Sequence, residues 1–241
     1  MQQLLERLLE EKEMQLKGSL YHYTQIKLAF NSNRIEGSRF SEDQVRYIYE
    51  TNTVNTGDEE AVDVDDIIET VNHFSCFDFM LLHADEELTE DMIREFHLLL
   101  KRSTSDERKE WFRVEEYKSR PNVVGDRETT EPSRVGGEMK KLLTEYTQKK
   151  EIKTEDIINF HYRFEIIHPF QDGNGRVGRI IMFKECLRHD ILPFIVGDEH
   201  KTLYYIGLQE YGADKGPLHD TCKSAQDEYK KMISYFYPNF D

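Results

Sequence analysis

Apolar residues recur at intervals of three and four along nearly the whole chain, and this period limits the available folds more than any other feature. Residues 63–84, for example, carry at this spacing Val64, Ile67, Ile68, Val71, Phe74 and Leu81. Such spacing is typical of the buried face of an amphipathic helix. Alternating apolar and polar runs, which are typical of half-buried strands, do not occur. The sequence therefore predicts an almost all-α fold.

Capping residues divide this pattern into separate helices. Ser19 and Thr89 stand at N-cap positions, and Gly18 stands where a C-cap glycine would end the first helix. Ser41 begins a capping box, and Pro132 suits a first helical turn. We expect helices at about 2–17, 19–37, 41–49, 63–84, 89–100, 132–146, 154–167, 175–187, 201–211 and 217–235.

Residues 103–131 interrupt the helical pattern. Short β-like pieces surround Pro121 to Gly125, and a polar tip from Asp126 to Glu131 follows them. Such a pattern indicates a hairpin. We therefore expect one small β-hairpin at 123–131, and a polar loop from Asn52 to Asp58.

The charge balance disfavours two classes of partner. The 241 residues include 32 Lys and Arg against 47 Asp and Glu, which gives a net charge of −15 at pH 7. Nucleic acids and anionic membranes are bound through basic patches, and this chain carries the opposite charge. We therefore expect neither a nucleic acid nor a membrane as a partner.

The cysteines and the apolar runs indicate the compartment. Cys76, Cys186 and Cys222 have no C-x-x-C spacing, so we expect buried free thiols rather than disulfides or zinc ligands. No apolar run reaches the roughly 18–20 residues that a membrane-spanning helix needs. The first residues lack the apolar stretch of a signal peptide. A cytoplasmic protein is expected.

The segment from His168 to Arg179 differs in kind from the rest. It reads HPFQDGNGRVGR and joins two apolar-periodic helices, so we expect a loop that enters a helix N-terminus. Gly173, Asn174 and Gly175 tolerate unusual backbone conformations, which lets successive N–H groups turn inward as an anion nest. The positive end of the helix dipole adds to this nest.

Charged side chains flank the predicted nest. Arg176 and Arg179 lie three apart on the following helix and can both grip a polyphosphate. Asp172 is a carboxylate of the kind that binds Mg²⁺ when phosphates supply the other ligands. His168 carries an imidazole, which can deprotonate a hydroxyl. Together these residues predict a group-transfer site that acts on a polyphosphate.

The same segment resembles the signature of the Fic family, H-P-F-x-[D/E]-G-N-G-R-x-x-R, without a departure. The resemblance implies a helical bundle with a β-hairpin flap beside the active loop. It also implies transfer of AMP from ATP to a Ser, Thr or Tyr hydroxyl of a target protein or of the protein itself. Mg²⁺ is the implied cofactor, with Mn²⁺ as an alternative ion. Relatives that phosphorylate their target carry Lys at the position of Gly175. Because this chain has glycine there, AMP transfer is favoured.

The resemblance implies a role for each residue of the signature. His168 is the base that takes the hydroxyl proton, and Asp172 holds the metal ion between the α- and β-phosphates. Phe170 anchors the loop in the core. The anion hole consists of Gly173, Asn174 and Gly175, and the outer phosphates are held by Arg176 and Arg179.

An upstream motif from Ser32 to Gly37 is similar to the family's inhibitory pattern, [S/T]-x-x-x-E-[G/N]. Ser32 and Glu36 are four apart and share one helix face. The resemblance implies that Glu36 pairs with Arg179 in the place of the γ-phosphate, because one guanidinium cannot serve both partners. In some relatives the same carboxylate positions a water molecule that removes AMP, and the sequence leaves both reactions open.

Other resemblances are weaker. Tyr204 and Tyr205 lie where the family often has a tyrosine pair against the adenine, and core packing explains them almost as well. Gly212 replaces an asparagine that relatives often carry in the base pocket. The hairpin is similar to the flap that holds a target by β-augmentation, and a simple surface hairpin is nearly as plausible. His161, one helical turn from Glu165, is expected to be structural.

These expectations combine into one interpretation with two alternatives. We expect an N-terminal arm at residues 1–58, with the inhibitory helix at about 20–37. The Fic core is expected at residues 59–215, and a C-terminal helix at residues 216–241 is expected to pack on that core. The chain is interpreted as an autoinhibited protein adenylyltransferase. One alternative is an enzyme that removes AMP, or that both adds and removes it. The other is a non-catalytic nucleotide sensor. The sequence does not decide whether the chain forms a homodimer, because the Leu-rich N-terminal helix can serve either as an interface or as a cover for the core.

Overall fold

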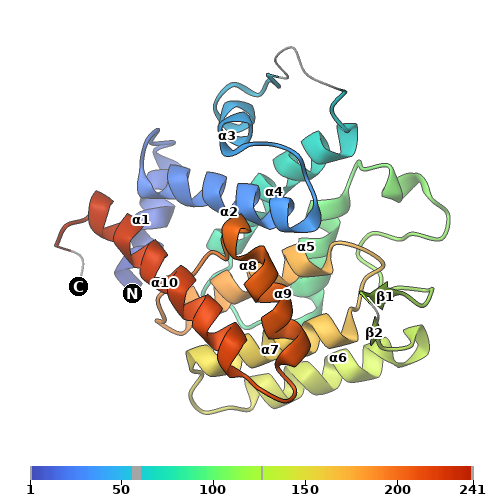
Figure 1. Ribbon diagram of the computed structural model, residues 1–241. Helices are drawn as coiled ribbons and strands as arrows, with labels where there is room; N and C mark the ends of the chain where they lie inside the picture. Colours follow the sequence, from blue (N-terminus) through green and yellow to red (C-terminus); the bar gives the residue numbers. More distant parts are fainter. Residues whose placement is uncertain (1, 56–60, 126, 240–241) are drawn as a thin grey trace.

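The computed structural model describes residues 2–55, 61–125 and 127–239. Within these ranges ten α-helices form a bundle, and a two-stranded hairpin lies at its edge (Figure 1). The prediction of an almost all-α fold with one hairpin is confirmed. The elements in chain order are α1 (Gln2–Glu13), α2 (Leu20–Glu36), α3 (Glu42–Thr51), α4 (Val64–Leu82), α5 (Glu90–Lys101), η1 (Asp106–Arg108), β1 (Val123–Val124), β2 (Arg127–Glu128), α6 (Pro132–Thr147), α7 (Thr154–Ile167), α8 (Asn174–Arg188), η2 (Asp198–His200), α9 (Lys201–Glu210) and α10 (Gly216–Phe236).

Helix α8 lies at the centre of the bundle. Helices α1, α2, α4, α5 and α7 all contact it, and its side chains are buried on every face. A helix surrounded in this way belongs to the core rather than to the surface. The second half of the signature is therefore part of the protein interior.

Helix α2 crosses the bundle above α8 (Figure 1). It begins at the predicted N-cap, where Ser19 Oγ accepts from the N–H of His22 at 3.3 Å. It ends at Gly37, whose φ of 109° suits glycine and whose N–H donates to Arg34 O. The bounds match the helix expected at about 20–37.

The first helix ends earlier than predicted. α1 ends at Glu13, and the chain turns through Gln15, which has a φ of 48°. The N–H of Leu16 already donates to Glu11 O at 3.0 Å, so the carbonyl groups at this end have partners. Gly18 lies instead in the turn that leads into α2. The prediction that Gly18 caps α1 is therefore wrong.

The buried face of α4 also differs from the predicted one. Val64 is 64% exposed and Val71 is 38% exposed. Helices α2 and α5 pack on two sides of α4, so its buried face is wider and more polar than the apolar spacing indicates. The buried side chains are Thr70, Asn72, His73, Phe74, Cys76, Phe77, Met80 and Leu81.

The leucines of α1 cover the core of this same chain. Leu4, Leu5 and Leu8 are buried among the other helices, which is the second of the two roles expected for this helix. All three cysteines are free and buried, as predicted. In the described ranges, no helix combines the length and the apolar character needed to cross a bilayer.

The hairpin forms at the predicted place. Val123 pairs with Glu128 and Val124 with Arg127 in an antiparallel register. Its tip residue Asp126 lies outside the described residues. Residues 56–58 of the expected polar loop, and the expected domain boundary at 58–59, also lie outside them.

Candidate active site

A sharp turn places His168 at the end of α7. His168 has a left-handed backbone with φ 50° and ψ 64°, and its N–H donates to Phe164 O at 2.8 Å. Pro169 follows and prevents the helix from continuing. Gly173, with a φ of 79°, is the N-cap of α8. The segment is thus a loop that enters a helix N-terminus, as predicted, with α8 beginning at Asn174.

The side chain of Asn174 fixes this loop. Its Oδ1 accepts from the N–H of Phe170 at 2.8 Å, and its Nδ2 donates to Phe170 O at 2.9 Å. Phe170 is fully buried and stacks on His97, with ring centroids 3.9 Å apart. The side chain of Asn174 therefore clamps the loop and is not free to bind an anion. The predicted anchor position of Phe170 is confirmed.

A buried carboxylate lies beside the imidazole of His168. Glu165 Oε2 lies 3.6 Å from His168 Nδ1. Burial opposes ionisation of Glu165, but His168 and His161 outweigh it and hold the pKa of Glu165 below its usual value. A carboxylate on the Nδ1 side leaves Nε2 to act as the proton acceptor. The spacing of Glu165 and His168, three residues apart at the end of a helix, was the signal that could have identified this partner.

The two motifs meet at Arg179, which lies 143 residues after Glu36 in the sequence. Arg179 NH2 donates to Glu36 Oε1 at 2.6 Å, and Arg179 Nε donates to Ser32 Oγ at 3.0 Å. Burial opposes the charge on Arg179, yet Glu36 outweighs it and raises the pKa of the guanidinium. The Arg179 side chain is 3% exposed, and that of Glu36 is 30% exposed. The contact thus joins α2 to the buried α8.

Glu36 also lies against the backbone at the start of α8. A Cβ at Gly175 would lie 2.2 Å from Glu36 Oε1, closer than atoms can approach. The carboxylate therefore occupies the space directly over the first turn of α8. This is the positive end of the helix, where free N–H groups and the dipole favour an anion.

Arg176 and Asp172 belong to a buried charge network. Arg176 forms ion pairs with Glu69 of α4 and, at 3.1 Å, with Asp172 Oδ2. Lys101 Nζ of α5 donates to the same Oδ2 at 2.7 Å. Burial opposes ionisation of Asp172, but Arg176 and Lys101 outweigh it and hold its pKa well below the usual range. Glu69 and Lys101 were missed from the sequence, because they stand in ordinary helical patterns without a local motif.

A pocket of about 290 Å³ opens on this network. Carboxylates dominate its lining, and the half-exposed side chain of Asp172 faces it. Oxygen donors of this kind suit a hard cation such as Mg²⁺. The donor chemistry thus fits the metal ion that the signature implies. The charged lining residues are Glu36, Asp63, Asp65, Asp66, Glu69, Lys101, Asp106, Asp172 and Arg176.

Comparison with known proteins supports the interpretation of the segment from His168 to Arg179 as a Fic signature. The sequence profile of the Fic/DOC family matches residues 87–186, which include the hairpin, α7 and the whole signature. Residues 87–186 thus form a Fic/DOC domain. The protein adenylyltransferase Fic of Nematostella vectensis is 26% identical to it over 230 residues, which are 88% of this chain and 51% of that protein. The chain thus spans about half the length of this curated relative.

Solved Fic structures share the fold of nearly the whole chain. A Fic domain-containing signaling protein from Bacteroides thetaiotaomicron has a TM-score of 0.73 and 20% identity, covering 95% of this chain and 94% of its own. A Fic family protein from Desulfovibrio desulfuricans has a TM-score of 0.74 and 23% identity, covering 98% and 74%. At these identities the likeness establishes the Fic fold.

The two adjacent tyrosines of this Fic protein lie in different environments. Tyr204 is 1% exposed, and its hydroxyl lies 2.6 Å from Nε2 of His161. Burial lowers the pKa of His161 to about 4. Tyr205 is 39% exposed, and its hydroxyl donates to Ile35 O on α2 at 3.2 Å. Only Tyr205 presents a surface to a ligand in this arrangement.

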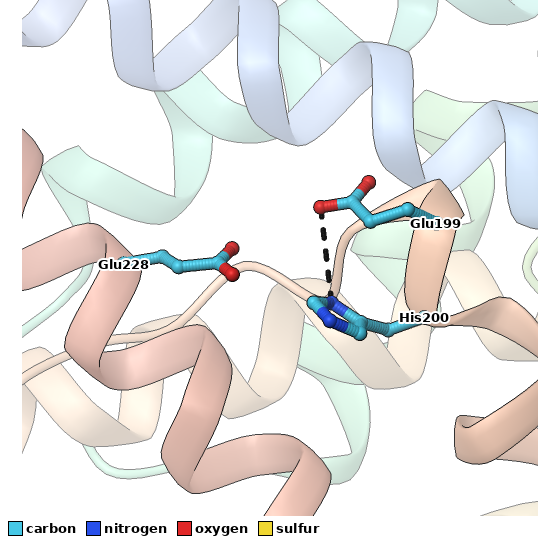
Figure 2. Close-up of side chains that lie close together, drawn as sticks. All are labelled: Glu199, His200 and Glu228. Atoms are coloured by element: carbon cyan, nitrogen blue, oxygen red, sulfur yellow. Dashed lines mark ion pairs between the residues drawn. The ribbon is translucent and has the colours of Figure 1, made fainter.

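A compact group of possible metal ligands lies elsewhere on the Fic protein. Figure 2 shows Glu199 and His200, beside the start of α9, turned toward Glu228 of α10. The three ligand atoms lie within 4.8 Å of one another, and His200 Nδ1 is 3.7 Å from Glu199 Oε1. Both glutamates are exposed, and exposed carboxylates often gather without a metal ion. None of the three residues belongs to the signature.

Proposed function

We propose that this Fic protein is an autoinhibited protein adenylyltransferase that transfers AMP from ATP to a hydroxyl of a target protein or of itself. One observation carries the proposal. The Glu36 carboxylate pairs with Arg179 over the first turn of α8, where a polyphosphate would bind. The name of the curated relative supports the same activity.

The proposed reaction needs a base beside an anion site. The hydroxyl oxygen attacks the α-phosphorus of ATP as the bond to pyrophosphate breaks. His168 takes the hydroxyl proton, and Glu165 stabilises the imidazolium that forms. The free N–H groups at the start of α8 hold the phosphate oxygens. Asp172 would hold Mg²⁺, or Mn²⁺, which neutralises part of the polyphosphate charge.

The remaining ligands follow from exposure and from existing partners. Arg179 is proposed to bind the γ-phosphate after Glu36 leaves it. Arg176 would reach a phosphate oxygen only by exchanging its Glu69 partner. Tyr205 is proposed to contact the adenine, because Tyr204 is buried against His161.

The second candidate reaction is hydrolytic removal of AMP from a modified target. The position of Glu36 favours it, because a part-exposed carboxylate over the anion site can also orient a water molecule. The non-catalytic nucleotide sensor is less favoured, since the pairing of His168 with Glu165 serves proton transfer. We propose the cytoplasm as the compartment, which the three free buried cysteines support.

Intact-mass analysis after incubation with ATP and Mg²⁺ tests the proposed function. Wild type and Glu36→Gly are compared, with His168→Ala as the control. We expect a gain of one AMP that is larger in Glu36→Gly and absent in His168→Ala. If neither protein gains mass while ATP still binds, the transferase proposal is wrong, and the same samples are then assayed for AMP removal.

A further inference from the structure

Three carboxylates surround the ammonium group of Lys101. Its Nζ lies 2.6 Å from Glu69 Oε1, 2.6 Å from Asp106 Oδ2 and 2.7 Å from Asp172 Oδ2. The carboxylates come from α4, η1 and the signature loop, whereas Lys101 is the last residue of α5. The Lys101 side chain is 3% exposed. The lysine is thus enclosed where four segments of the chain meet.

The three carboxylates are arranged as in a cation-binding site, and the ammonium group of Lys101 takes the place of the cation. Carboxylate oxygens converge on hard metal ions in the same way, at about 2.3–2.6 Å for Ca²⁺. An ammonium group has three N–H donors, so it provides one for each of the three oxygens. Buried carboxylates require such a partner, because an uncompensated charge in the interior is strongly destabilising.

The charges of the network indicate what the lysine does. Apart from Lys109, which pairs with Asp106 from the exposed side, Lys101 and Arg176 oppose the three carboxylates of Glu69, Asp106 and Asp172, which leaves one negative charge in excess. Without Lys101 the excess is two, which one divalent cation neutralises. A divalent cation at Asp172 therefore competes with an ammonium group already bound to the same carboxylate.

We propose that Lys101 is a positioning residue, which holds the Asp172 carboxylate through Oδ2 and weakens the binding of a divalent metal ion there. The inference rests on the proposed function, which assigns Asp172 to the metal ion. With one oxygen held by Lys101 and Arg176, the half-exposed carboxylate keeps a fixed orientation toward the pocket. The lysine thus sets both the geometry and the metal affinity of Asp172.

Binding of Mn²⁺ to the nucleotide-free protein tests this proposal without any transfer reaction. Mn²⁺ affinity is measured by electron paramagnetic resonance for wild type and for Lys101→Met. Removal of a unit charge this close to the site is expected to tighten Mn²⁺ binding by roughly tenfold or more. Adding Asp172→Asn to Lys101→Met is expected to abolish most of the gain.

Lys109→Met is the matched control. Lys109 also pairs with Asp106, but from the exposed side and without touching Asp172. Because exposed pairs contribute little, its Mn²⁺ affinity should stay within about twofold of wild type. An equal gain in Lys109→Met would show a general charge effect and would overturn the assignment to Lys101.

Lys101→Gln is the second variant, because the loss of a buried cation can prevent folding. Its amide still donates to the carboxylates while the charge is gone. If a variant folds only when Mn²⁺ is added, as followed by circular dichroism, the metal ion replaces the ammonium and the proposal holds. Folded variants that bind Mn²⁺ no tighter than wild type contradict it, and so do variants that stay unfolded in Mn²⁺. Absence of AMP transfer in the wild type and in Glu36→Gly, with the gain in Mn²⁺ affinity still observed in Lys101→Met, would instead count against the proposed function.

Discussion

At the scale of single residues, the site depends on close approaches that leave no room for other side chains. Gly175 is the clearest case, because its missing side chain makes space for the Glu36 carboxylate and the end of Arg179. The signature glycine therefore makes room for the contact between Glu36 and Arg179, in addition to its place in the proposed anion site. Glycine is required here by a contact with another helix, because the Gly175 backbone itself is helical and is not among those with a positive φ.

We predict that Gly175→Ala destabilises the protein by about 1–3 kcal/mol, since the added methyl group must displace Glu36. In the Glu36→Gly background the same change should cost clearly less, because the displaced group is absent. Urea unfolding measures both values. Gly136→Ala, at an open position of α6, is the control and should be neutral or stabilising. Equal costs in the two backgrounds would refute the steric explanation.

The residues of the signature could be predicted because they are contiguous in sequence. Their partners could not, since Glu69 and Lys101 lie on helices whose relative position no local pattern records. The sequence likewise predicted an anion site in the loop but missed that the Asn174 side chain is used as a clamp.

At the scale of elements, the central contact is the docking of α2 on α8. The caps of α2 were readable from Ser19 and Gly37, so its bounds were predicted. The exposed side of α4 was not predicted correctly, because the width of its buried face depends on how α2 and α5 pack against it. Periodicity identifies a helix, whereas its neighbours decide how many faces are buried.

We predict that Glu36→Gly and Arg179→Ala have non-additive effects on stability. Each single change breaks a mostly buried ion pair and should cost about 1–3 kcal/mol in the free energy of unfolding. The double variant should lose less than the sum, because no charge is then left without its partner. The surface pair Arg134 and Glu138 on α6 is the control, and there each change should stay within about 0.5 kcal/mol. Additive losses at Glu36 and Arg179 would show that the pair does not hold α2 to α8.

At the scale of the whole molecule, an acidic protein keeps ionised carboxylates in its interior. Glu185 of α8 is 1% exposed and lies 2.8 Å from Lys184 Nζ and 3.3 Å from His189 Nε2. Burial opposes its ionisation, but these partners outweigh it and hold the pKa of Glu185 below its usual value. A depressed pKa contributes stability that is present above the unfolded-state pKa of about 4.3 and is lost as the pH falls through the folded value.

We therefore predict that the free energy of unfolding falls as the pH drops below about 4, and that Glu185→Gln makes this dependence shallower. Chemical denaturation between about pH 3 and about pH 7 measures the slope. Glu138→Gln, on the surface of α6, should leave the slope unchanged. A wild-type slope retained in Glu185→Gln would show that other carboxylates carry the acid sensitivity.

The central place of α8 has a consequence for how this protein can change over generations. The helix that carries the second half of the signature is also the one that α1, α2, α4, α5 and α7 pack around. A substitution there that harms chemistry will often harm folding too, so the two defects are inherited together. The α2 motif touches that helix mainly at one end, through Ser32 and Glu36. The proposed inhibition can therefore be retuned or lost by small changes in α2, while α8 stays as it is.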